Sequence, residues 1–142
     1  MLKGLDPLLS PDLLRILRAM GHGDMIAIVD GNYPAETDAK RLVRLDGHGA
    51  PRILDAILSV MPVDDMVPEA VWRPAAYLDP KRMEPVFEDF NSVLLKYEPK
   101  QKIVPLTGDE RVTAKPWLAS AKVSPLTRTV TVFVTSPSRK ET

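Results

Sequence analysis

Short apolar runs and amphipathic helix patterns alternate along this chain, and that alternation constrains its fold more than any other feature. The clearest run is residues 25–30, which is rich in β-branched side chains and ends in an acid. Alternating strands and helices predict an α/β fold, with an open, mostly parallel sheet covered by helices. The predicted strands are 25–30, 41–46, 69–77, 102–106 and 127–135; the predicted helices are about 11–20, from Pro51 onward, and about 80–97.

The first helix carries its own start and stop signals. Ser10 can cap the helix with its hydroxyl, Pro11 suits the first helical position, and Asp12 places an acid in the first turn. Gly21 follows the last apolar residue, where a left-handed residue commonly ends a helix. The strand at 25–30 lacks alternation, so we expect it to be a central strand buried on both faces.

Composition bounds the function. The length of 142 residues predicts a single domain over 1–142. Nineteen basic side chains balance nineteen acidic ones, which argues against nucleic acid as a partner. Cysteine is absent, so thiol catalysis, disulfides and thiolate metal sites are excluded. No apolar run approaches membrane-spanning length, and no signal peptide is recognisable. We therefore expect a cytoplasmic location and no membrane partner.

Two residues in the first third are the best candidates for chemistry. His22 lies between Gly21 and Gly23 in a predicted helix-to-strand turn, where an imidazole would be accessible to a ligand. Imidazole gives and takes a proton near pH 7, which suits general acid–base catalysis. Asp30 ends the following strand, at the sheet edge where ligands tend to bind in α/β proteins. Its carboxylate could accept hydrogen bonds from substrate hydroxyls or fix the tautomer of a histidine.

Each candidate also has a purely structural interpretation. A histidine between glycines is often a solvated loop residue, and an aspartate at a strand end often caps the next turn. His48, also between glycines, is interpreted as a loop residue, and Asp64 and Asp65 as part of a solvated acidic loop. No third ligand has useful spacing for a metal site, and no dinucleotide fingerprint is present, so we expect no cofactor and no metal.

The first half of the chain contains a series of ordered motifs: Leu2-Lys-Gly-Leu, Leu8-Leu-Ser-Pro-Asp-Leu-Leu, Met20-Gly-His-Gly-Asp-Met-Ile, Asp30-Gly-Asn-Tyr-Pro, Leu45-Asp-Gly, and Ile53-Leu-Asp-Ala-Ile-Leu-Ser-Val-Met-Pro-Val-Asp. These motifs resemble those of the L-fucose mutarotase and D-ribose pyranase family, closer to its fucose branch. The resemblance implies a cytoplasmic isomerase that interconverts sugar anomers, with an α/β fold and ring-shaped homo-oligomers. It implies that His22 is the general acid and that Asp30 binds the monosaccharide substrate.

The last third departs from the family pattern. Glu110-Arg111 matches the start of a family segment, so Arg111 is a second candidate substrate contact, although the aromatic residues that should follow are missing. Thr129-Val-Thr replaces the tyrosine- and asparagine-containing triplet expected before the last strand. Three explanations stay open: divergence toward another ligand, a non-catalytic sugar-binding or oligomeric relative, or an altered reading frame near residue 111.

Overall fold

The computed structural model describes residues 2–76, 79–106 and 129–135, the last of these as a strand whose side chains are not described. The helices are α1 (Pro11–Ala19), α2 (Ala35–Asp38), α3 (Ala50–Leu58) and α4 (Pro85–Tyr97). The strands are β1 (Met25–Asp30), β2 (Arg41–Asp46), β3 (Val71–Pro74), β4 (Ile103–Leu106) and β5 (Thr129–Thr135). Five strands and three helices were predicted within a few residues of these bounds; the single turn α2 was not predicted.

The strands form two ladders, and the larger one has the order β1-β5-β2. β5 is antiparallel to both neighbours, so β1 and β2 run in the same direction on either side of it. β3 and β4 pair in parallel. The α/β class is confirmed, and the expected mostly parallel sheet needs one correction. The last strand inserts antiparallel between β1 and β2, which makes β5 the central strand of this ladder and β1 an edge.

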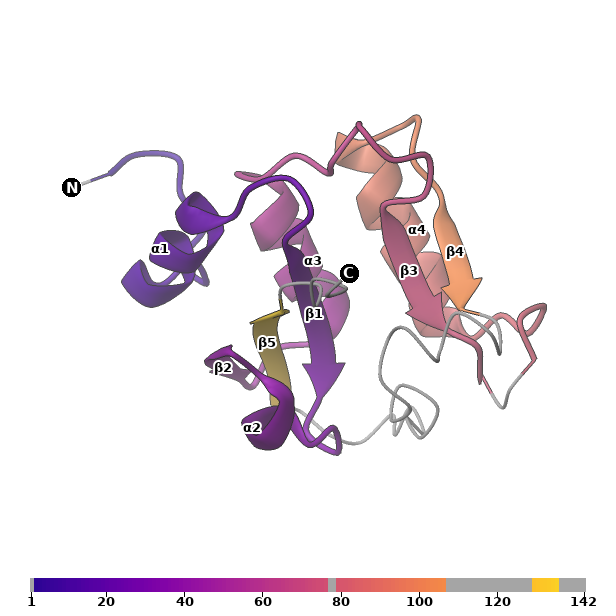
Figure 1. The fold of residues 1–142 in the computed structure, drawn as a ribbon, viewed down its shortest axis with the longest axis horizontal. Coiled ribbons are helices and arrows are strands. Elements are labelled where there is room, and N and C mark those ends of the chain that lie inside the picture. Colours follow the sequence, from indigo (N-terminus) through magenta and orange to yellow (C-terminus); the bar gives the residue numbers. More distant parts are fainter. Residues whose placement is uncertain (1, 77–78, 107–128, 136–142) are drawn as a thin grey trace, which may run out of the picture.

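Two helices, α3 and α4, lie on one side of these ladders. In Figure 1, α3 lies behind β1 and α4 behind β3 and β4, and α3 contacts both α4 and β1. No helix in the described segments is long and apolar enough to span a bilayer. A loop precedes β1 and another follows it; His22 lies in the preceding loop, and Asp30 is the last residue of the strand.

The main core joins α1 and α3 to the inner side of β1 and β2. Leu13 of α1 and Ile53 of α3 are fully buried there, and Ile26 and Val43 of the strands pack against them. Burying one such side chain contributes about 1.5–3 kcal/mol relative to leaving it in water. The residues of β1 after Met25 are only half-buried, so the expectation that this strand is buried on both faces is wrong for the described part of the chain.

The N-terminal signals of α1 act as predicted, whereas its end differs. Ser10 Oγ accepts a hydrogen bond of 3.2 Å from the backbone N–H of Leu13. Gly21 does not adopt the predicted left-handed conformation. The chain leaves the helix extended at Met20, and the positive φ occurs at Gly23 (φ 82°), in the turn closed by the Asp24 N–H and the Gly21 carbonyl.

The helix α4 begins at Pro85, later than the predicted residue 80. Proline lacks the N–H that an earlier start would require, and its ring would clash with a preceding helical turn. Residues 79–82 form a separate turn, in which the carboxylate of Asp79 accepts a hydrogen bond of 2.9 Å from the Lys81 N–H.

Candidate active site

The turn that joins α1 to β1 holds His22 at the surface. Gly21 donates its N–H to Asp24 Oδ2 at 3.0 Å, which closes the turn together with the Asp24–Gly21 backbone bond. The His22 side chain is 71% exposed, so the imidazole is open to a ligand. The accessibility predicted from the flanking glycines is confirmed.

The partner of His22 comes from the loop after α3. His22 Nδ1 lies 3.1 Å from Oδ1 of Asp64, whose side chain is only 25% exposed. α3 ends at the same edge of the sheet at which β1 begins, and this brings together two residues that are 42 positions apart (Figure 1). The Val63 N–H donates to Glu98 Oε1 at 3.2 Å, which anchors the loop to the end of α4. Asp64 is therefore held beside the imidazole.

Asp64 is an ionised acceptor at neutral pH. The Met66 N–H donates to its Oδ1 at 2.9 Å, and this bond is the largest influence that lowers the pKa of Asp64 below 3.8. Hydrogen bonding and charge from His22 lower the pKa further, and partial burial opposes them. A carboxylate has no proton to give, so His22 Nδ1 must be the donor. The other ring nitrogen, Nε2, is then the one that can accept or deliver a proton.

The interpretation of Asp64 as merely part of a solvated acidic loop is therefore wrong. The sequence placed it in an acidic pair with Asp65, and only the fold distinguishes the two residues. Asp65 is exposed and makes no side-chain hydrogen bond or ion pair with the described residues, whereas Asp64 contacts the candidate acid–base group. No local pattern could have identified Asp64, because its partner belongs to a different loop.

Asp30 lies at the opposite end of β1 from His22. The strand alone separates Met25 from Asp30 by roughly 16 Å, at about 3.3 Å per residue, and Figure 1 shows the two ends pointing to different loops. Asp30 Oδ1 accepts from the Asn32 N–H at 3.0 Å, and Oδ2 accepts from Asn32 Nδ2 at 3.3 Å. Asp30 therefore caps its own turn and does not fix the tautomer of His22. One chain does not bring the two predicted site residues together.

Comparison with known proteins identifies the fold and the family. The chain matches the RbsD / FucU transport protein family over residues 3–114. It belongs to this family. It is 39% identical to human fucose mutarotase over 103 residues (66% of this chain and 64% of the human protein) and 35% identical to the mouse protein over 115 residues (74% and 72%). The match thus spans just under two thirds of the human relative.

Solved structures agree with this RbsD / FucU assignment. FucU from Bifidobacterium longum superposes with a TM-score of 0.68 at 27% identity, over 92% of this chain and 96% of that one. The fucose mutarotase of Streptococcus pneumoniae, solved with L-fucose, superposes with a TM-score of 0.64 over 93% of this chain and 96% of that one. At 23% identity, the second comparison shows a shared fold. The family resemblance seen in the sequence is confirmed.

The other sequence predictions for this family member concern residues outside the His22–Asp64 pair. Arg111, the second predicted substrate contact, lies outside the described residues. His48 is exposed in the loop before α3. Among the described residues, no three His, Cys, Asp or Glu side chains are grouped to hold a metal ion.

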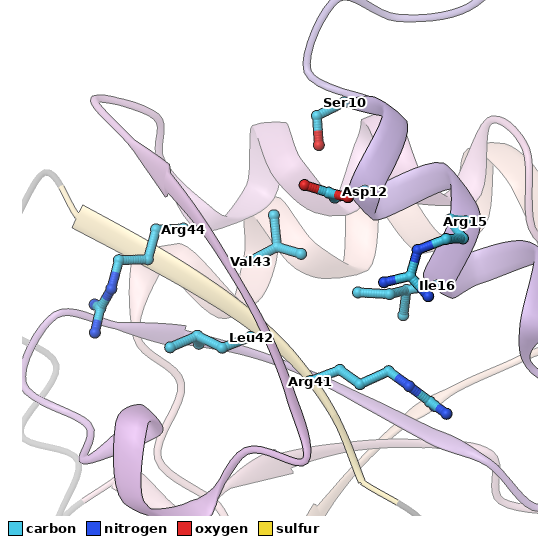
Figure 2. Close-up of a pocket in the computed structure, with 8 residues that line it drawn as sticks. All are labelled: Ser10, Asp12, Arg15, Ile16, Arg41, Leu42, Val43 and Arg44. Atoms are coloured by element: carbon cyan, nitrogen blue, oxygen red, sulfur yellow. The ribbon is translucent and has the colours of Figure 1, made fainter.

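A hollow of about 500 Å³ lies between α1 and β2. Figure 2 shows Arg15 and Ile16 of the helix on one side of it and the residues of β2 on the other, with Arg44 directed away from Arg41. Arg44 Nη2 is 3.1 Å from the carboxylate of Glu36. Neither His22 nor Asp64 lines this hollow, so we assign it no step in catalysis. Its lining residues are Ser10, Asp12, Arg15, Ile16, Arg41, Leu42, Val43 and Arg44.

Proposed function

We propose that this protein is a mutarotase, an isomerase that interconverts the α and β anomers of a fucose-like or ribose-like monosaccharide by general acid–base ring opening and closure. The observation that carries the proposal is the exposed imidazole of His22 with its Nδ1 held 3.1 Å from Asp64. The similarity to human and mouse fucose mutarotases supports the same reaction.

The reaction needs only proton transfers. Protonated His22 Nε2 delivers a proton to the ring oxygen, and the anomeric hydroxyl loses its proton to solvent as the C1–O5 bond breaks. The resulting aldehyde rotates about C1–C2, and the C5 hydroxyl adds to the other face of the carbonyl. Its proton returns to Nε2, and the carbonyl oxygen takes a proton from solvent. General acid–base assistance of this kind contributes roughly 10²–10⁴-fold. Asp64 stabilises the protonated imidazole and keeps Nε2 directed outward.

We further propose that a complete site is shared between two chains of a homo-oligomer. His22 and Asp30 lie at opposite ends of β1, so both can contact one monosaccharide only if they come from different copies. Closed rings are the usual outcome when the two surfaces of such a contact differ and the rotation closes. This arrangement supports the ring-shaped assembly that the family resemblance implies.

Other parts of the proposal rest on the resemblance and the sequence. We propose that Asp30 orients substrate hydroxyls, that Arg111 is a second substrate contact, that residues 1–142 act as a single domain, and that the protein works in the cytoplasm. The alternative, a sugar-binding relative without turnover, is favoured by Thr129-Val-Thr in place of the family triplet.

An anomer-exchange measurement tests the proposal. NMR saturation transfer between the α and β signals of L-fucose, D-ribose and D-galactose gives the exchange rate with and without protein. We expect a rate above the uncatalysed one for at least one sugar. Binding without faster exchange would identify the non-catalytic alternative, and no effect of the protein on any sugar would contradict both.

A further inference from the structure

Several exposed apolar side chains are close in sequence to His22 or Asp64. Eight large apolar side chains are exposed in the described part of the chain, and three of them lie within three residues of His22 or Asp64. These are Met25, Met66 and Val67, of which Met66 is 73% exposed. An exposed methionine gains little for the stability of one chain, so this position is better explained by something that binds there.

The backbone fixes Met66 next to the reacting group. Its N–H donates to Asp64 Oδ1 at 2.9 Å, and the same oxygen is 3.1 Å from His22 Nδ1. A single carboxylate oxygen thus separates the amide nitrogen of Met66 from the imidazole. A sugar whose ring oxygen meets Nε2 must extend the rest of its ring over the residues that surround the pair.

The chemistry of Met66 selects among sugars. A thioether side chain is flexible and apolar and is only a weak hydrogen-bond acceptor. A methyl group placed against this side chain gives up no hydrogen bonds when water leaves it. A hydroxyl in the same place loses its hydrogen bonds to water without replacement. We infer that Met66 is a specificity-determining residue whose side chain contacts the C6 methyl of a 6-deoxyhexose. This inference rests on the proposed mutarotase function.

Two sugars that differ only at C6 test it. L-Fucose carries a methyl group where L-galactose carries a hydroxymethyl group. The catalysed exchange rate, corrected for the uncatalysed rate of each sugar, gives kcat/KM for both. We expect the wild-type protein to favour L-fucose, Met66→Gln to reduce that preference by roughly tenfold, and Met66→Leu to retain it. Gln has nearly the length of Met, so the substitution changes polarity more than shape.

Leu95→Gln, an exposed apolar residue on α4, is the matched control and should leave the preference unchanged. An unchanged preference in Met66→Gln would overturn the inference and leave the mutarotase function intact. An equal loss of activity on both sugars, or a changed oligomer mass by light scattering, would also overturn it, because Met66 would then support the fold or a contact between chains. Absence of catalysis in the wild-type protein would overturn both.

Discussion

Nδ1 of His22 lies 3.1 Å from Oδ1 of Asp64, although the two residues are 42 positions apart in the chain. The pair joins the turn before β1 to the loop after α3, and it leaves the imidazole open on its other side. This relationship defines an acid–base group whose orientation is set by a neighbouring carboxylate.

Removing the charge of Asp64 should impair catalysis. Asp64→Asn loses the carboxylate that stabilises the protonated imidazole, and its amide can present an N–H to Nδ1 and so favour the wrong tautomer. We expect the anomer-exchange rate to fall by roughly tenfold or more. Asp65→Asn, the exposed neighbour, should behave as the wild type. Equal behaviour of the two variants would show that Asp64 has no such role.

Substitution of the two histidines should have very different effects on the catalysed rate. His22→Gln removes the only imidazole in the proposed site, and we expect the catalysed rate to fall by roughly 10²-fold or more. His48→Gln changes an exposed loop residue and should retain full activity. NMR exchange spectroscopy on L-fucose measures both variants. If His48→Gln lost activity and His22→Gln retained it, the acid–base group would be His48 and the assignment to His22 would be wrong.

A site shared between chains predicts complementation. His22→Gln and Asp30→Asn should each be nearly inactive alone, because each substitution removes one of the two residues from every site of its own oligomer. When the two variants are co-expressed, some sites receive His22 from one chain and Asp30 from another, and activity should rise well above that of either parent. Exchange rates of the mixed oligomers provide the measurement. A mixture no more active than its parents, or a monomer mass by light scattering, would exclude a shared site.

Asp55 should stabilise the fold in a pH-dependent way. Lys96 Nζ and the Tyr97 hydroxyl donate to its Oδ1 at 2.7 and 3.0 Å, tying α4 to α3. The Lys96 bond chiefly lowers the pKa of Asp55 below 3.8, with Tyr97 contributing and partial burial opposing. The folded pKa is below the unfolded one, so this stabilisation is complete above 3.8 and is lost as the pH falls through the folded value.

Asp55→Asn should therefore lower the melting temperature by about 3 °C at pH 7. It should have little effect once the pH is well below 3.8. Thermal unfolding followed by circular dichroism at both pH values is the measurement. Asp89→Asn, an exposed residue of α4, serves as the control. An equal effect of Asp55→Asn at both pH values would mean that the charge of Asp55 does not contribute to the stability of the fold.

Truncating Leu13 should reduce the free energy of unfolding more than truncating Leu95. Its side chain is fully buried between α1 and α3, so Leu13→Ala leaves a cavity and should reduce the free energy of unfolding by about 3 kcal/mol. Leu95→Ala removes the same atoms from an exposed site on α4 and should change it by less than about 0.5 kcal/mol. Urea denaturation measures both. Similar losses would place Leu95 in a buried contact between chains.

Local signals account for most of the elements that the sequence predicted. The Ser10 hydroxyl, Pro11 and the apolar stripe specify α1 because each acts within one or two helical turns. β1 and β2 follow from short β-branched and alternating runs in the same way. The exposed position of His22 also follows locally, from the two glycines beside it. The catalytic role of His22 and the binding roles of Asp30 and Arg111 stay predictions.

The relationships between distant segments could be known only from the tertiary structure. The sequence by itself determined the helix and strand segments, the family and the candidate imidazole, because these depend on neighbouring residues and ordered motifs. Only the fold decided that β5 lies between β1 and β2, that Asp64 and not Asp30 meets His22, and that β1 holds His22 and Asp30 apart. The reason is physical: contacts across 42 or more residues depend on how whole elements pack, and no short pattern encodes that packing.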